Sequence, residues 1–248
     1  MTRTRPTALV VAAVLAAAGC VALGIWQGRR LMGRRAANEA TLARRELPVV
    51  VLNDPATPTD LAQRRVVASG NYDHLTSLVL RGRLEREVPG VFLVTPLRLD
   101  GRPDAVLVLR GFVPAADAHR PDTSLVARPD GVEVTVEGIA LAVPSSPDSG
   151  SPLTTSGFTS WRRLDLAALR RRIPYPLLDV YVHETTAGRQ DGMTAGTDRK
   201  RPFPRPVALP PLDDGPHLAY MIQWFGIAVV AAAFGIAVLR STRRRIDE

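Results

Sequence analysis

The sequence of 248 residues contains one cysteine, Cys20, and one lysine, Lys200. A single cysteine excludes an internal disulfide and a site built from several thiolates. The sequence also lacks an H-x-x-x-H spacing of metal ligands, a G-x-S-x-G nucleophile motif and a glycine-rich phosphate loop. These absences argue against a catalytic centre, and we expect a protein that is not an enzyme.

The formal net charge of +8 does not indicate a nucleic-acid partner. Six of the 32 basic and two of the 24 acidic residues lie near the chain ends, which leaves 26 and 22 between Gln27 and His217. The two signs are interspersed there, without the basic, aromatic-rich element that binds nucleic acid. Because arginine is used almost without lysine, and alanine is frequent, the composition is typical of a GC-rich bacterial genome.

Two apolar spans, Thr7–Ile25 and Leu218–Leu239, contain no charged residue, and nothing comparable lies between them. Each has about 20 residues, enough for a helix to cross the hydrocarbon core of a bilayer. The pattern therefore predicts a multi-pass membrane protein: a hairpin of two helices in contact with lipid, which carries a folded domain in its loop.

The charges that flank the second span orient the hairpin. Arginines follow it at 240 and 243–245, and Asp213 and Asp214 precede it. The positive-inside rule then places both termini in the cytoplasm and the loop domain outside. Four arginines between 29 and 35 favour the reverse orientation. We give the second span more weight because its charge contrast is sharper, and we expect a bacterial plasma membrane.

The predicted segments are a cytoplasmic N-terminus (1–6), a transmembrane helix (7–26), an extracytoplasmic β-rich domain (27–216), a second transmembrane helix (217–239) and a basic cytoplasmic tail (240–248). An alternative is lipoprotein processing, because Ala17–Cys20 resembles a cleavage box and cleavage would remove the first helix. We favour a retained helix, since the apolar stretch continues past Cys20 and exceeds the usual signal core.

The loop domain is expected to be α+β and mainly antiparallel β, as a sheet or a small barrel. A basic helix is predicted over 29–45, and strands over 64–72, 75–83, 91–99, 105–113, 132–143 and 177–183. Pro89-Gly90 and Asp100-Gly101 are among the expected turns. A short helix is predicted over 165–172, a mobile loop over Pro144–Gly157 and a polar return segment over Ala187–Pro211.

Six polar or aromatic residues gather at the outer ends of the two spans: Trp26, Gln27, His217, Tyr220, Gln223 and Trp224. His217, Tyr220 and Trp224 lie on one helix face because of their i, i+3, i+7 spacing. An aromatic belt accounts for Trp26 and Tyr220. It accounts poorly for His217 and Gln223, because unpartnered polar side chains are costly at that depth. The residues alone leave two interpretations open: an aromatic belt, or a pocket whose imidazole ligates a haem iron.

Five segments, in order along nearly the whole chain, carry a family resemblance: Leu23–Arg30 (LGIWQGRR), Gly70–Tyr72 (GNY), Pro89-Gly90 with Thr95–Leu97 (TPL), Val108–Pro114 (VLRGFVP), and His217–Tyr220 (HLAY) with Gln223–Phe225 (QWF). In these segments the chain resembles the surfeit locus protein 1 family. Leu109 and Phe112 depart from the family's usual Asn and Trp. Members are cytochrome c oxidase assembly factors with two transmembrane helices around an extracytoplasmic domain.

The resemblance implies a factor for aa3-type cytochrome c oxidase that binds haem a at the outer membrane interface and delivers it to the catalytic subunit. The haem a synthase is the second implied partner. The family's haem-binding His and Trp match His217, as iron ligand, and Trp224. The remaining candidates for the haem surroundings or helix pairing are Trp26, Gln27, Tyr220 and Gln223. We expect Arg30 to pair with a haem propionate. The alternative is a scaffold that binds no haem and stabilises an oxidase assembly intermediate.

Overall fold

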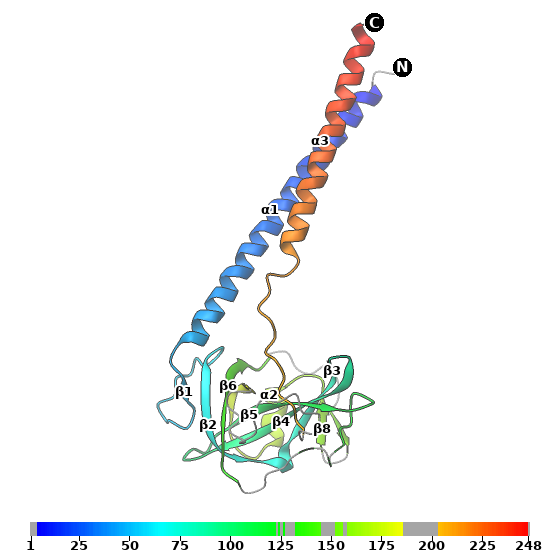
Figure 1. The fold of residues 1–248 in the computed structure, drawn as a ribbon. Coiled ribbons are helices and arrows are strands. Elements are labelled where there is room, and N and C mark those ends of the chain that lie inside the picture. The colour runs from blue at the N-terminus through cyan, green and yellow to red at the C-terminus, as the bar shows by residue number, and fades with distance from the viewer. Residues whose placement is uncertain are drawn as a thin grey trace. The chain divides into compact units, whose positions relative to one another are not determined.

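The computed structural model describes residues 4–122, 124, 126, 132–144, 152–155, 158–185 and 203–247. The chain separates into two compact units (Figure 1). One unit contains residues 1–42 and 211–248 and is built from two long helices. The other contains residues 43–210 and holds every strand found in the described part of the chain.

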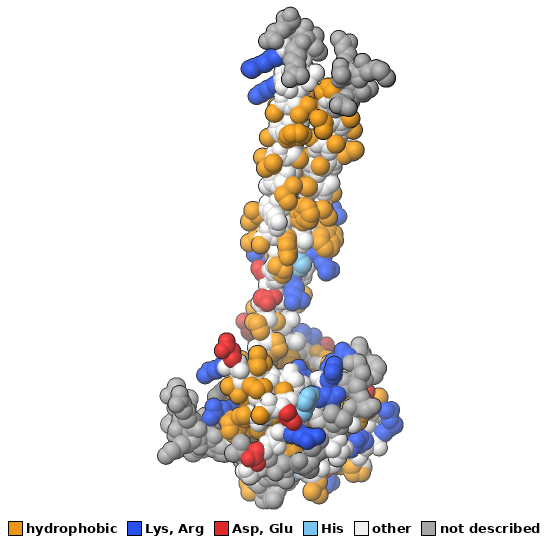
Figure 2. Space-filling model, turned by 90° about the vertical axis from the view of Figure 1, so that its right-hand side faces the viewer, with side chains coloured by type: hydrophobic (Ala, Val, Ile, Leu, Met, Phe, Trp, Pro, Cys, Tyr) orange, Lys and Arg blue, Asp and Glu red, His pale blue; other side chains and the backbone are white. Residues whose placement is uncertain are grey.

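The helical unit pairs α1 (Thr4–Glu46) with α3 (His217–Asp247), which run antiparallel (Figure 1). Both helices are long and apolar enough to cross a membrane by length and composition. Only 11% of the most apolar window of each is buried, and hydrophobic side chains cover the surface of the pair (Figure 2). The prediction that the first span continues as a basic helix through Arg45 is confirmed.

The β unit is built on a closed ring of five strands: β2 (Arg65–Tyr72), β6 (Val134–Ala142), β9 (Leu177–Glu184), β5 (Ala105–Pro114) and β4 (Val88–Leu99). Neighbours are antiparallel except β5 and β9, which are parallel. The ring closes where Gly70–Tyr72 pair with Leu97–Leu99. The expected α+β, mainly antiparallel domain is confirmed, and of the two predicted forms, a sheet or a small barrel, the structure shows the barrel.

Other elements extend this barrel at its edges. β3 (Leu78–Glu85) pairs with the first half of β4 and continues the sheet through β8 (Phe158–Trp161) and β7 (Leu153–Thr155). β1 (Val50–Val51) lies parallel to β2. The short helix α2 (Leu166–Arg172) begins where the Asp165 carboxylate accepts a hydrogen bond from the Ala168 N–H at 2.9 Å.

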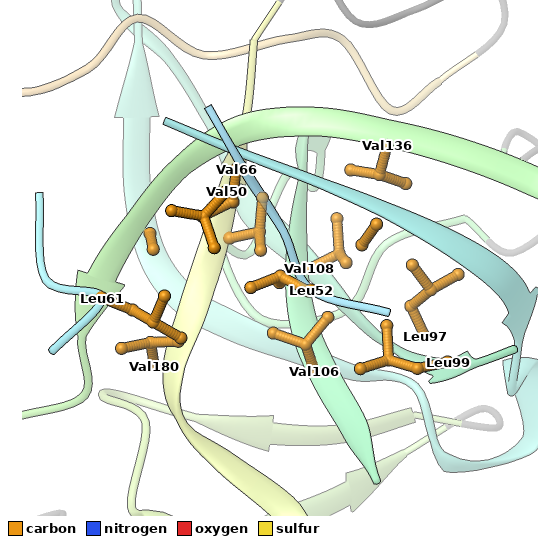
Figure 3. Close-up of a cluster of buried hydrophobic side chains, with 13 residues drawn as sticks. Val50, Leu52, Leu61, Val66, Leu97, Leu99, Val106, Val108, Val136 and Val180 are labelled. Carbon is orange, nitrogen blue, oxygen red and sulfur yellow. The ribbon is translucent and has the colours of Figure 1, made fainter. Parts of the chain in front are cut away.

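Strand β5 shows how the core is divided. Val106 and Val108 point into the barrel, where they pack with residues of the other four strands (Figure 3). Leu107 and Leu109 point to the opposite face and pack against α2. Because successive side chains alternate across a strand, a run of apolar residues at 105–109 fills two cores at once.

Two details of the predicted loop domain are wrong. Pro89-Gly90 is not a turn but lies inside β4. The chain reverses instead at Arg86 and Glu87, whose φ angles are 48° and 67°. The strand expected from residue 75 begins at Leu78, because Asp73 caps a short 3-10 helix, η1 (His74–Thr76).

The predicted mobile loop at Pro144–Gly157 contains a strand, β7. Its residues 145–151 and 156–157 lie outside the described residues, as do 187–202 of the predicted return segment. The end of that segment is held by the β unit, since Arg205 pairs with Phe112 through backbone hydrogen bonds of 2.7 and 2.9 Å.

Candidate functional site

The candidate site lies in the helical unit, where His217 opens α3. Its Nδ1 atom is 2.9 Å from Oε1 of Gln27 on α1. An amide oxygen accepts but cannot donate, so the neutral tautomer that fits this contact has its proton on Nδ1. In that tautomer Nε2 presents a lone pair. A hydrogen bond from the second ring nitrogen is the arrangement that fixes the tautomer and ring orientation of histidines that bind metals.

The Nε2 atom of His217 has no hydrogen-bond partner among the residues that the structure describes. The side chain is half-buried, and the glycine next to it, Gly215, has a φ of +67° and lies close to the ring. A Cβ at residue 215 would lie 3.6 Å from Nε2. The ring nitrogen that could ligate a metal therefore has little bulk near it on this side.

The other predicted site residues are distributed differently. Trp26 and Tyr220 are 52% and 47% exposed, and Gln223 is also exposed, whereas Trp224 is half-buried. The Arg30 guanidinium lies 5.6 Å from the centre of the Trp26 ring, in cation–π contact along α1. Of the predicted cluster, the described contacts thus bring together His217 with Gln27, and Trp26 with Arg30.

The residues that pack the helices together at this site were missed by the sequence analysis. A Cβ at Gly24 would lie 2.9 Å from the Phe225 ring, and a Cβ at Gly28 would lie 3.1 Å from Sδ of Met221. A larger side chain at Gly24 would displace the Phe225 ring, and one at Gly28 would make the flexible Met221 side chain shift by a few tenths of an ångström. The signal was present: Gly24 and Gly28 form a G-x-x-x-G motif within an apolar span.

A polar clasp joins α1 to the segment that directly precedes α3. The Arg35 Nε atom donates to the Asp214 carboxylate at 2.8 Å, and Arg34 lies 3.8 Å from the Asp213 carboxylate. The Asn38 amide donates to the backbone oxygen of Asp213 at 3.0 Å. This clasp fixes the chain four residues before His217 and so limits how far His217 can move from α1.

The signature segments of the loop domain meet inside the β unit. The Arg110 guanidinium lies 4.6 Å from the centre of the Tyr72 ring, which connects the segments VLRGFVP and GNY. Arg110 occupies the bulge where Leu93 pairs with Gly111 and Val94 with Leu109. Gly111 has a φ of +138° and lies directly against the Arg205 backbone, so only glycine fits there. These residues close and buttress the barrel.

The fold and site define a class of protein in which a β-barrel domain is inserted, in the sequence, between two long apolar helices. A hydrogen-bonded histidine lies where these helices pack. The SURF1 family model matches residues 14–229. The chain belongs to this family of cytochrome c oxidase assembly factors, and the family predicted from the five segments is confirmed.

Two relatives show the extent of the similarity. The chain is 27% identical to a SURF1-like protein of Monosiga brevicollis, over 90% of this chain and 84% of the relative. It is 25% identical to Surfeit locus protein 1 of Rattus norvegicus, over 75% of this chain but only 60% of the rat protein. The matched family region contains the whole barrel, α1 from residue 14 onward and α3 as far as residue 229.

Proposed function

We propose that this protein binds haem a through His217 and delivers it to the catalytic subunit of an aa3-type cytochrome c oxidase. The observation that carries the proposal is the His217–Gln27 hydrogen bond, because it leaves Nε2 available as an axial ligand. Haem supplies the redox-active iron, and the protein supplies its binding and release. The partners would be the haem a synthase as donor and the oxidase subunit as acceptor.

The surroundings of His217 suit an apolar macrocycle. Trp224, half-buried on α3, and the exposed rings of Trp26 and Tyr220 offer aromatic surface at the same end of the helix pair. Arg30 is exposed beside Trp26, and its guanidinium suits a propionate carboxylate. Undiminished haem a occupancy in an Arg30→Ala variant would remove Arg30 from the proposed site.

We further propose that the helix pair spans the bacterial plasma membrane with both termini in the cytoplasm and the barrel outside. The exposed apolar surface of the pair supports insertion in lipid. The ion pairs of Arg34 and Arg35 with Asp213 and Asp214 offset part of the positive charge that opposed this orientation. The arginines at 240, 243 and 244 then mark the cytoplasmic end.

The test is the absorption spectrum of the detergent-purified protein after co-expression with the enzymes of haem a synthesis. We expect a haem a spectrum that is lost in His217→Ala and weakened in Trp224→Ala. Gln27→Leu should keep a partial spectrum with shifted bands, because the ligand remains but its orienting hydrogen bond does not. His119→Ala, which changes an exposed histidine of the β unit, is the matched control.

The scaffold alternative predicts a different set of results. If the parent protein carries no haem a when haem is abundant, and His217→Ala still supports oxidase assembly, the haem proposal is wrong. The second result is measured as oxidase activity in membranes of a strain that lacks its own copy of this assembly factor and expresses His217→Ala instead. The barrel would then be the part that stabilises the oxidase assembly intermediate.

A further inference from the structure

The β unit contains a cavity that has no role in the proposed haem function. Its volume is about 300 Å³, and it lies between η1, the start of β3, the β7–β8 pair and α2. Its apolar walls are formed by Leu75, Leu78, Phe158, Trp161, Leu169 and Ile173. All of these except Leu75 are buried, whereas Leu75 is 95% exposed and extends the apolar surface outward.

The polar groups around this cavity favour an anion. The lining includes Arg172, which is exposed and donates to the Thr159 hydroxyl at 3.1 Å. No Asp or Glu lines the cavity among the residues that the structure describes. The Asp73 carboxylate, which caps η1, accepts hydrogen bonds from the Tyr175 hydroxyl at 2.7 Å and from the Leu75 N–H at 3.1 Å. Asp73 is therefore already engaged within the fold.

Trp161 gives the cavity an aromatic wall. Its side chain is 3% exposed, and its indole nitrogen is buried within the fold. The charged group that the lining offers to a ligand is therefore Arg172.

We propose that this cavity binds a monocarboxylic acid with an apolar body of about ten carbon atoms. The size follows from the volume, which corresponds to roughly ten groups the size of a water molecule at ~30 Å³ each. The apolar body fills the space between α2 and the β8 strand, and the carboxylate meets Arg172 at the rim. The acid comes either from lipid, as a straight alkyl chain, or from the aqueous phase, as a compact aromatic acid.

The experiment uses the full-length protein in lipid nanodiscs and a decanoic acid that carries a diazirine on its chain. After photolysis, mass spectrometry of peptides locates the attachment. We expect saturable labelling within residues 75–78 or 158–173. Unlabelled decanoate and naphthaleneacetate are the competitors: stronger competition by decanoate indicates a lipid-derived acid, and stronger competition by naphthaleneacetate indicates a soluble aromatic one. Decanol should compete at least tenfold more weakly than the better acid.

Two variants separate the cavity from general adsorption. Arg172→Gln should weaken labelling about tenfold, whereas Arg171→Gln changes a neighbouring exposed arginine outside the lining and should leave it unchanged. Trp161→Phe keeps an aromatic wall and leaves Arg172 in place, and should change labelling by less than about twofold. Labelling confined to α1 and α3, or lowered equally by Arg171→Gln and Arg172→Gln, would overturn the proposal. Because Arg172 is exposed, its variant is expected to fold even if Trp161→Phe does not.

Discussion

The two units of this protein bury their apolar residues in opposite ways. The β unit buries its valines and leucines inside a closed ring of strands. Leu97, Val106 and Val108, in the barrel interior, are each 0% exposed. The helix pair leaves most of its apolar side chains exposed and meets along a narrow stripe that includes Ala13, Gly24 and Ala228. The barrel thus carries its own hydrophobic core, whereas most of the apolar surface of the helices is left uncovered within the described residues.

The contrast extends to polar groups. In the barrel, neighbouring strands satisfy the backbone N–H and C=O groups, so closure leaves few free edges. In the helix pair, the backbone is satisfied within each helix. The hydrogen bond between His217 and Gln27 joins the two helices, and the clasp around Asp213 and Asp214 joins α1 to the segment before α3. Removing one side chain should therefore have different consequences in the two units.

The largest expected effect is in the barrel core. Leu97→Ala removes a fully buried side chain where β4 closes on β2, and should lower the free energy of unfolding by about 2–5 kcal/mol. Val51→Ala, at a residue 52% exposed on β1, should change it by less than about 0.5 kcal/mol. The free energy of unfolding of both variants is measured by urea unfolding of the full chain, with hydrogen exchange of the β5 amides as the readout. Similar losses would mean that the barrel interior does not dominate stability.

The next largest effect is expected at the stripe where the two helices pack together. Gly24→Leu places a side chain where a Cβ alone would be 2.9 Å from the Phe225 ring, so the helices should separate at a cost of about 1–3 kcal/mol. Gly19→Leu is the matched control, because nothing lies within 4 Å of a Cβ there. The readout is the yield of a disulfide between cysteines at 13 and 235 in a Cys20→Ala background. An equal drop in disulfide yield in Gly24→Leu and Gly19→Leu would show that close packing at Gly24 does not hold the helices together.

These two regions also differ in how well the sequence predicted them. The five barrel strands were found because runs such as Ala105–Leu109 combine β-branched residues with flanking turns. β7 was missed because it has three residues and depends on its pairing with β8 rather than on its own sequence. The reversal at Arg86-Glu87 was missed because neither residue is a typical turn residue with positive φ.

The site was predicted in part for a similar reason. The placement of His217 and Gln27 at one level followed from two antiparallel spans, and the structure joins them. Which face of each helix turns toward the other depends on packing at Gly24 and Gly28, so the contacts of Met221 and Phe225 were not anticipated. Exposure of Tyr220 and Gln223 follows from the same rotation of α3.

A smaller effect is expected from acid in the β unit. His183 is buried, and burial, with a smaller contribution from Arg45, lowers its pKa below 6.5 despite its hydrogen bond to the Val207 oxygen. The unfolded state then binds more protons, so stability should fall as pH drops below about 6.5 towards the lower folded pKa. His183→Gln should flatten this part of the unfolding-versus-pH curve, and His119→Gln, at an exposed residue, should not. A curve unchanged in His183→Gln would assign the acid sensitivity elsewhere.

The smallest effect is expected at the clasp of the helix pair. Arg35 and Asp214 are 2.8 Å apart but 53% and 39% exposed, and such ion pairs contribute at most about 1 kcal/mol. Arg35→Gln should therefore lower the 13–235 disulfide yield less than Gly24→Leu does. The difference from the parent should vanish near 1 M salt, where charges are screened within roughly 3 Å. Arg29→Gln, at an exposed arginine of the same helix, is the control. If Arg35→Gln lowers the disulfide yield equally at low and high salt, Arg35 acts through packing. The clasp would then hold the chain by side-chain contact, as the stripe around Gly24 does, and not as a surface ion pair.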